Sequence, residues 1–177
     1  MPDLQPLLEG PRLRLRPLRR EDWDEMFAVA SDPEIWAVHP ERQRYEEPIF
    51  RLFFDGALAS GAALTILDKA NGRIIGSSRY LGHDPQRSEI EIGWTFLARA
   101  YWGGDYNREI KRLMLDHAFA FVDTVTFWVG ADNIRSRRAM EKIGGVLRDD
   151  VRMRNYSWGP CPHVIYEIRK DQALGEA

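Results

Sequence analysis

The sequence has little cysteine, no long apolar run and almost no net charge, and each shortage excludes a class of protein. Among its 177 residues is one cysteine, Cys161, so no disulfide can form within the chain and the reducing cytoplasm is the expected location. Its apolar runs are too short to span a membrane, and residues 1–16 lack the features of a signal peptide. The formal net charge of −2 offers no broad basic surface, so neither nucleic acid nor a membrane is an expected partner.

Apolar periodicity and turn signals divide the chain into strands and helices. Strands are expected at residues 13–18, 63–68, 73–81, 89–97, 124–129, 145–153 and 164–168, and helices at 21–30, 46–60, 106–121 and 134–143. Asn71-Gly72 is a strong hairpin signal between two of these strands. The order predicts a mixed α/β fold, with about seven strands and four helices in one domain over residues 1–170 and a flexible tail at 171–177.

The most informative segment follows the strand 89–97. A loop with Gly103-Gly104 leads there into a helix that begins near Tyr106–Arg108. The first N–H groups of a helix have no partner within it, and the helix dipole is positive at that end. Small residues let a phosphate approach these amides, and basic residues follow in the first two turns. The segment predicts either a pyrophosphate site or a tight turn with solvated basic side chains.

Three motifs, which follow one another along the chain, help to interpret that segment. They are Glu91-Ile92-Gly93-Trp94, the loop YWGGDYN at residues 101–107, and the segment from Asn133 to Gly144, which reads NIRSRRAMEKIG. With them, the chain resembles the GNAT superfamily of N-acetyltransferases over nearly its whole length. It looks most like the branch that contains the ribosomal-protein N-terminal acetyltransferases.

The resemblance implies acetyl-CoA as the acetyl donor. Its pantetheine arm is expected to pair with the strand end at 94–97, where the sheet splays between its fourth and fifth strands, and its pyrophosphate to rest on the amides of the glycine loop. A backbone amide near Phe96 or Leu97 is expected to stabilise the oxyanion. The expected cofactor-binding residues are Trp94, Thr95, Phe96, Leu97, Trp102, Gly103, Gly104, Asp105, Tyr106, Asn107, Arg108, Asn133 and Ser136.

Three positions depart from the family pattern. Asp105 replaces a glycine, and Asn107 replaces a small residue. Asp105 either caps the helix, or faces water, or weakens the cofactor site. Met140 stands where many relatives have a tyrosine that protonates the leaving thiolate, and methionine cannot donate a proton. Ser136, Tyr106 or water must serve instead, or the thiolate leaves unprotonated.

An acceptor ammonium must lose a proton before its nitrogen can attack, and Glu91 is the candidate base. Strand alternation predicts one face with Glu89, Glu91, Gly93, Thr95 and Leu97, opposite Ile90, Ile92, Trp94 and Phe96. A cross-strand ion pair between Glu91 and Arg79 is an equally good interpretation, and the two are compatible.

The acceptor is expected to bind between the first two helices. Trp36, His39 and Tyr45 fall in that region, and Arg79 completes the expected substrate-binding set. His39 is either a second base or a surface residue. Cys161 and His163 lack a second pair of ligands, so no metal site is expected.

The sequence therefore predicts an enzyme that transfers an acetyl group from acetyl-CoA to a primary amine, on a protein N-terminus or a small molecule. Attack is expected to be direct, within a ternary complex of a monomer or homodimer. The alternative, favoured by Asp105 and Met140, is a catalytically weak acyl-CoA-binding sensor or structural domain. The glycine pattern does not match a dinucleotide-binding oxidoreductase, and the sequence does not name the acceptor.

Overall fold

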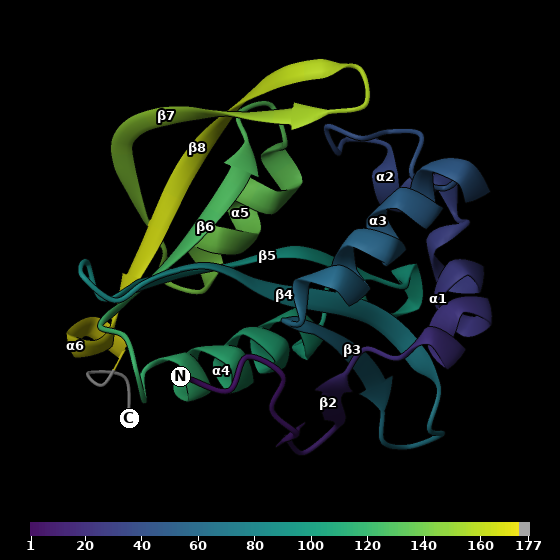
Figure 1. Ribbon diagram of the computed structural model, residues 1–177, viewed down its shortest axis with the longest axis horizontal. Coiled ribbons are helices and arrows are strands. Elements are labelled where there is room, and N and C mark those ends of the chain that lie inside the picture. Colours follow the sequence, from purple (N-terminus) through teal and green to yellow (C-terminus); the bar gives the residue numbers. More distant parts are fainter. Residues whose placement is uncertain (174–177) are drawn as a thin grey trace.

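The computed structural model describes residues 1–173 and arranges them around one mixed sheet of eight strands (Figure 1). The strands are β1 (Leu8–Glu9), β2 (Leu13–Pro17), β3 (Ala63–Asp68), β4 (Ile74–Asp84), β5 (Glu89–Leu97), β6 (Thr124–Gly130), β7 (Val146–Tyr156) and β8 (Gly159–Arg169). The helices are α1 (Trp23–Ala30), α2 (Pro33–Trp36), α3 (Glu47–Ser60), α4 (Tyr106–Ala118), α5 (Ile134–Lys142) and α6 (Lys170–Ala173), with 3₁₀ turns at Arg20–Asp22 and Arg99–Tyr101. The sheet order is β1-β2-β3-β4-β5-β6-β8-β7, with β5 and β6 parallel and every other pair antiparallel, which confirms the predicted mixed α/β class.

Three short elements were not predicted. Strand β1 has two residues, too few for an alternating pattern, and brings the sheet to eight strands instead of seven. Helix α2 spans one turn, with Pro33 at its start and the Asp32 side chain accepting from a first-turn amide. Helix α6 occupies the start of the predicted tail, and residues 174–177 lie outside the described part of the chain.

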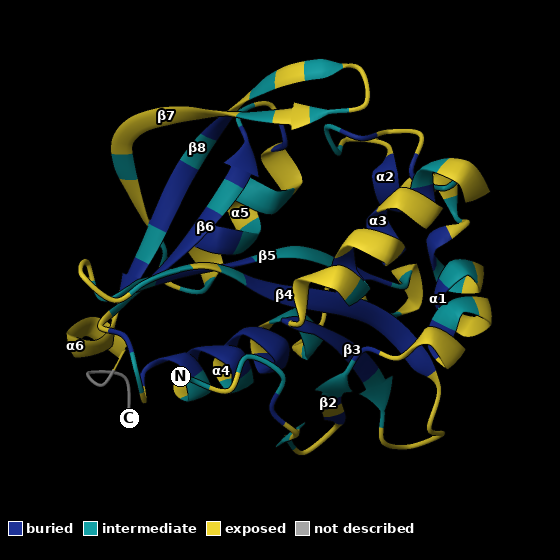
Figure 2. Ribbon diagram, viewed as in Figure 1, coloured by how far each residue is buried: buried dark blue, intermediate teal, exposed yellow. Residues whose placement is uncertain are grey.

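Helices cover the sheet on both faces and enclose two apolar cores. Ile90 and Ile92 of β5 pack with Ile110 of α4 in the first core. Phe50 of α3 and Phe96 of β5 belong to the second core, which α1, α2 and α3 share. Figure 2 shows the buried central strands between these two layers. Within residues 1–173, no helix is long and apolar enough to cross a membrane.

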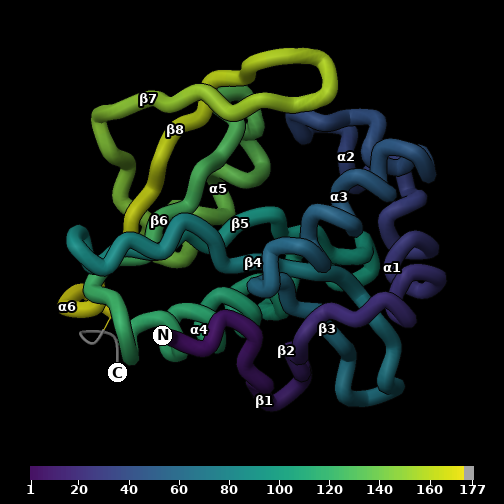
Figure 3. The backbone as a smooth tube through the Cα atoms, viewed as in Figure 1, coloured from purple at the N-terminus to yellow at the C-terminus, as the bar shows by residue number. Residues whose placement is uncertain are grey.

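Strands β5 and β6 pair at one end only. Glu89, Ile90 and Glu91 pair with residues 124–126, and beyond that point the two strands diverge, as Figure 3 shows. Past the divergence β5 stays bonded to β4, and β6 to β8. The predicted splay is therefore confirmed, and the facing edges of β5 and β6 leave backbone groups free to bind an extended ligand.

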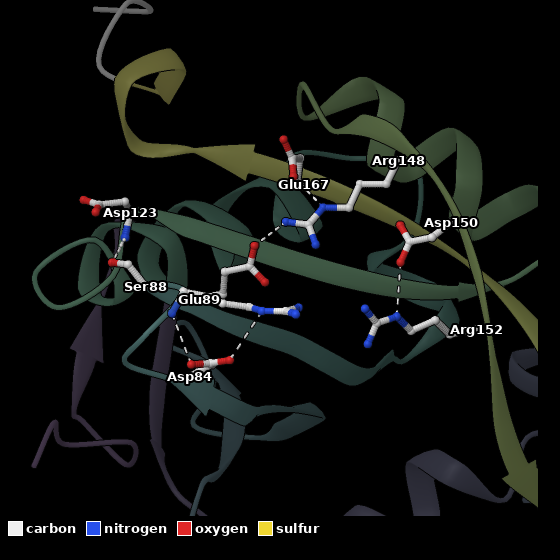
Figure 4. Close-up of polar contacts among 9 residues, drawn as sticks. Asp84, Ser88, Glu89, Asp123, Arg148, Asp150, Arg152 and Glu167 are labelled. Atoms are coloured by element: carbon white, nitrogen blue, oxygen red, sulfur yellow. Dashed lines mark hydrogen bonds and ion pairs between the residues drawn. The ribbon is translucent and has the colours of Figure 1, made fainter.

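Arginines of β7 reach across the sheet face to the paired end of the splay. The Arg148 guanidinium donates to Glu167 of β8 and to Glu89 of β5 (Figure 4). Strand β7 is strongly curved, with a register shift against β8 between Leu147 and Val151. Beyond this curve, Arg154 of β7 reaches Glu91 of β5.

Candidate active site

Strand β5 contains a bulge where the splay opens. The register against β4 shifts between Gly93 and Phe96, so that Trp94 and Thr95 stand opposite a single β4 residue, Ser78. Trp94 adopts a left-handed backbone conformation with a φ of 57°. Non-glycine residues adopt this conformation rarely, and bulges of this kind re-aim side chains next to functional sites.

The bulge reverses the alternation predicted for β5. Trp94 and Phe96 pack in the core of α1–α3, away from Ile90 and Ile92, and Leu97 returns to the α4 side. The predicted grouping of Trp94 and Phe96 with the isoleucines is therefore wrong. A strand's period of two holds only while no residue is inserted, and the insertion depends on the neighbouring strand.

A cavity of about 100 Å³ opens at the splay and passes between β5 and β6. Five predicted site residues line it, namely His39, Trp94, Thr95, Asn133 and Ser136, and Met140 lines it as well. Phe96 and Leu97 are buried in the two cores on either side of β5.

The turn before α4 has the features of an anion cradle. Gly103 has a φ of 73°, and a Cβ on Gly103 or Gly104 would meet no backbone atom within 4 Å, so the space before the turn is open. Glu109 donates the first amide bond of the helix, to the Asp105 carbonyl. Within the described chain, the amides of residues 106–108 have no bonded partner. These free donors and the open glycine turn fit a pyrophosphate.

Asp105 does not cap α4. It occupies the N-cap position without a side-chain cap bond, and its side chain is 71% exposed. Its carboxylate lies 3.8 Å from the Arg12 guanidinium. The side chain therefore faces water beside a positive charge, the second of the three predicted possibilities.

Trp102 ties the glycine turn to the splayed end of β5. Its indole N–H donates to the Leu97 carbonyl at 2.8 Å, and the Arg135 guanidinium of α5 stacks 4.1 Å from its ring centroid. Arg135 also donates to the Ile35 carbonyl at 2.9 Å. Trp102 thus positions the turn and connects it to α5 across the opening.

Asn133 begins α5 and also faces the cavity. Its side-chain oxygen accepts from the Ser136 amide at 3.3 Å, so it caps the helix. Asn133 is 5% exposed, and with its oxygen engaged, the amide N–H₂ remains available to the cavity.

Glu91 is paired with Arg154, not with Arg79. The Arg154 guanidinium of β7 donates to both carboxylate oxygens at 2.9–3.0 Å. The predicted partner Arg79 donates instead to the Phe53 carbonyl at 3.4 Å. Burial raises the pKa of Glu91, and Arg154 opposes that rise.

Of the residues predicted to bind the acceptor, Trp36 and Tyr45 pack in the protein core, and His39 lines the cavity. Trp36 is 2% exposed and donates to the Ala30 carbonyl, and Tyr45 packs against the α1–α3 core. His39 lines the cavity and accepts the Glu41 amide on Nδ1 at 2.9 Å. Burial lowers its pKa well below the usual value, so His39 is neutral, with its proton on Nε2. In that tautomer it donates to the cavity and cannot accept a proton there.

Two residues of the β7–β8 hairpin form a proton-accepting pair that sequence analysis missed. His163 is 1% exposed, and its Nδ1 lies 3.0 Å from the Cys161 carbonyl, which can only accept a hydrogen bond. Nε2 is therefore the free acceptor, and the Tyr156 hydroxyl donates to it at 2.7 Å. Both side chains line the cavity. The spacing Tyr156–His163 resembles no motif, because the pair forms only once the hairpin closes.

Lys111 is a third residue that sequence analysis missed. It is 3% exposed, lines the cavity, and donates to the Thr95 hydroxyl at 2.7 Å. Burial lowers its pKa to about 7. A lysine on the apolar stripe of the predicted helix, next to Ile110, was the available signal, because buried lysines are rare unless they serve a function.

Comparison with known proteins agrees with this geometry. Residues 12–146 match the GNAT acetyltransferase domain family. A putative acetyltransferase from T. thermophilus is 27% identical, with a TM-score of 0.76 over 96% of this chain and 92% of that one. A GCN5-related N-acetyltransferase from Brucella melitensis is 21% identical, with a TM-score of 0.82 over 95% and 80% of the two chains.

The spermidine N-acetyltransferase from Vibrio cholerae, solved in complex with CoA and spermine, is 16% identical with a TM-score of 0.68, over 93% of this chain and 99% of that one. The family match spans most of the sequence and includes the splayed strands, the glycine turn and α5. The chain belongs to the GNAT family of acetyltransferases.

Proposed function

We propose that the protein transfers an acetyl group from acetyl-CoA to a primary amine by direct attack. The observation that carries this proposal is the cavity that passes through the splay and joins a donor side, lined by α4 and α5, to an acceptor side, lined by the β7–β8 hairpin and the loop before α3. A structural neighbour solved with CoA and spermine supports a CoA thioester as the donor and an amine as the acceptor.

On the donor side, the chain offers backbone and side-chain groups to acetyl-CoA. The free amides of residues 106–108 would hold the pyrophosphate, the open edge of Trp94–Leu97 the pantetheine, and Asn133 its far side. Bound there, acetyl-CoA supplies an acetyl group activated as a thioester. The cavity then excludes bulk water from the point where the two sides meet.

Tyr156 and His163 are proposed to accept the acceptor's proton. The Tyr156 oxygen takes the proton from the ammonium as its own proton passes to His163 Nε2, and the Cys161 carbonyl holds the resulting imidazolium through Nδ1–H. Burial lowers the pKa of His163, so its imidazole is neutral and its Nε2 carries no proton before the transfer, and the same shift makes it a weaker base. Glu91, the base predicted from the sequence, stays the other candidate for this role.

Two proton donors replace the tyrosine absent at Met140. Lys111 and Ser136 both line the cavity beside Met140. With a pKa near 7, Lys111 carries a transferable proton at neutral pH. Burial and Asp132 raise the pKa of the Cys161 thiol, and Cys161 does not line this cavity, which supports direct transfer without a covalent enzyme intermediate.

Release of free thiol from acetyl-CoA in the presence of a panel of primary amines tests the proposal. We expect saturable, amine-dependent release that requires folded protein. Tight CoA binding without release across the panel would contradict the proposal and favour the sensor alternative.

A further inference from the structure

Arg44 brings an unneutralised positive charge to the acceptor side of the cavity. It lies in the loop before α3, is 5% exposed and lines the cavity. Its Nε has no hydrogen-bond partner, and no carboxylate oxygen among residues 1–173 lies within 4.0 Å of its guanidinium. Glu41, on the same loop, accepts instead from the Ser157 amide and hydroxyl at 3.0 and 2.8 Å.

Arg79 of β4 also lacks a counter-ion, although it does not line the cavity. It is 9% exposed, its Nε is also unpartnered, and it forms no ion pair within the described chain. Its guanidinium lies 4.7 Å from the Trp94 ring centroid, and that of Arg44 lies 5.5 Å from the same centroid. Within residues 1–173, the indole N–H of Trp94 is a third buried donor without a partner.

These donors are costly unless a ligand uses them. A buried charge without a counter-ion is strongly unfavourable, and cation–π contacts offset only about 1–2 kcal/mol each. Burial lowers the pKa of Arg44 and of Arg79 to about 10. Tyr156 and Glu41 partly oppose this shift at Arg44, and Arg154 adds to it at Arg79, so both guanidinium groups stay charged at neutral pH. Arg154, the third arginine at Trp94, is already neutralised by Glu91.

We propose that the amine acceptor carries an anionic group, a carboxylate or a phosphate, which binds Arg44 in the cavity beside Trp94, where the nearby charge of Arg79 adds to the attraction. This inference rests on the acetyl transfer proposed above and names its acceptor class. Guanidinium groups match both anions in shape and charge. The cavity of about 100 Å³, room for roughly three water molecules, fits a small acidic group. A polyamine brings only positive charge and is repelled.

The test uses pairs of amines that differ only in the anion. β-Alanine is compared with β-alaninamide, phosphoethanolamine with ethanolamine, and spermidine is added as a polyamine. Calorimetry on the CoA-loaded protein measures binding without turnover, and thiol release from acetyl-CoA measures transfer. We expect the anionic member of at least one pair to bind about tenfold tighter or more. Equal affinity within both pairs, including no binding at all, would overturn the proposal.

Matched variants locate the anion. Arg44→Gln is expected to abolish the preference and Arg79→Gln to weaken it, with the CoA dissociation constant near the wild-type value. The melting temperature of the ligand-free protein should stay equal or rise, because each variant removes a buried charge without a counter-ion. Arg42→Gln, an exposed arginine on the same loop that does not line this cavity, is the control and should keep the preference. If one glutamine variant unfolds, the other variant tests the assignment of the anion to these arginines. Arg44→Lys retains the charge but loses the planar guanidinium group.

The outcomes separate this inference from the proposed function. Anion preference in calorimetry without thiol release with any amine would leave the anion site standing and remove the transferase function. Thiol release that is equally fast with neutral and anionic amines would support the transferase function and remove the anion site. A preference unchanged in both glutamine variants would overturn the assignment to these arginines.

Discussion

At the scale of single residues, two candidates could accept the acceptor's proton: a pair that lines the cavity, and Glu91, which is bonded to the lining residue Arg154. Glu91 is a carboxylate whose two oxygens are already bound by Arg154. Tyr156 and His163 form a hydrogen-bonded pair with a free acceptor direction toward the cavity. Turnover measured in variants of Tyr156 and of Glu91 distinguishes the two candidates.

We expect Tyr156→Phe to lower turnover by about 10²-fold or more, because it breaks the path to His163. If His163 is the acceptor, activity in the wild type falls as pH drops through its pKa, which burial places below the ordinary 6.5. Glu91→Gln is the comparison, with CoA affinity measured for both. Unchanged turnover in Tyr156→Phe, together with a large loss in Glu91→Gln at preserved CoA affinity, would return the role to Glu91.

Lys111 makes stability depend on pH. Its pKa falls from 10.5 to about 7 on folding, so between those values the unfolded chain binds a proton that the folded chain lacks. Stability therefore rises as pH increases through that window. Lys111→Met removes the buried charge, and we expect it to stabilise the fold most below about pH 7 and progressively less toward about pH 10.

Urea denaturation across that pH range measures this effect, with the exposed Lys142→Met as the control. A stability difference independent of pH would contradict the lowered pKa of Lys111. A Lys142→Met variant should show no such trend.

At the scale of elements, the close pairing of β4 and β5 beyond the bulge positions the open edge. A Cβ on Gly76 would lie 2.1 Å from the Phe96 carbonyl oxygen, a contact that only backbone movement can relieve. Gly76→Ala should therefore cost about 1–3 kcal/mol or more. Thermal denaturation checks this.

Gly56 provides the opposite case within α3. A Cβ there meets nothing within 4 Å, so Gly56→Ala should stabilise the helix by about 0.5–1 kcal/mol. Similar effects in both alanine variants would mean that the strands do not approach as closely as described.

Element bounds show where sequence patterns suffice. Strands β3 and β5 begin and end where predicted, because apolar alternation and polar turns bracket them. Strand β8 starts at Gly159, five residues before its predicted start, because Pro160 and Pro162 argue against a strand. The β7–β8 tip accepts prolines because its pairing there has one side only.

At the scale of the whole molecule, the site was only partly predictable. The glycine turn and the Asn133 cap are local features, and their residues lie where the motifs place them. The partner of Glu91 and the pair of His163 come from a hairpin that folds across the sheet, and no local pattern encodes such contacts. The chain's net charge of −2 likewise hides two arginines without a carboxylate partner beside Trp94.

The central claim is that acetyl-CoA lies along the free edge of β5 and on the free amides at the start of α4. The amide ¹⁵N–¹H NMR spectrum of the labelled protein, titrated with CoA, tests it most directly. We predict that the largest shifts fall on residues 94–97 and 103–108, with Asn133 next. A titration that leaves these amides unmoved in folded protein, or that moves only amides elsewhere, would contradict the account.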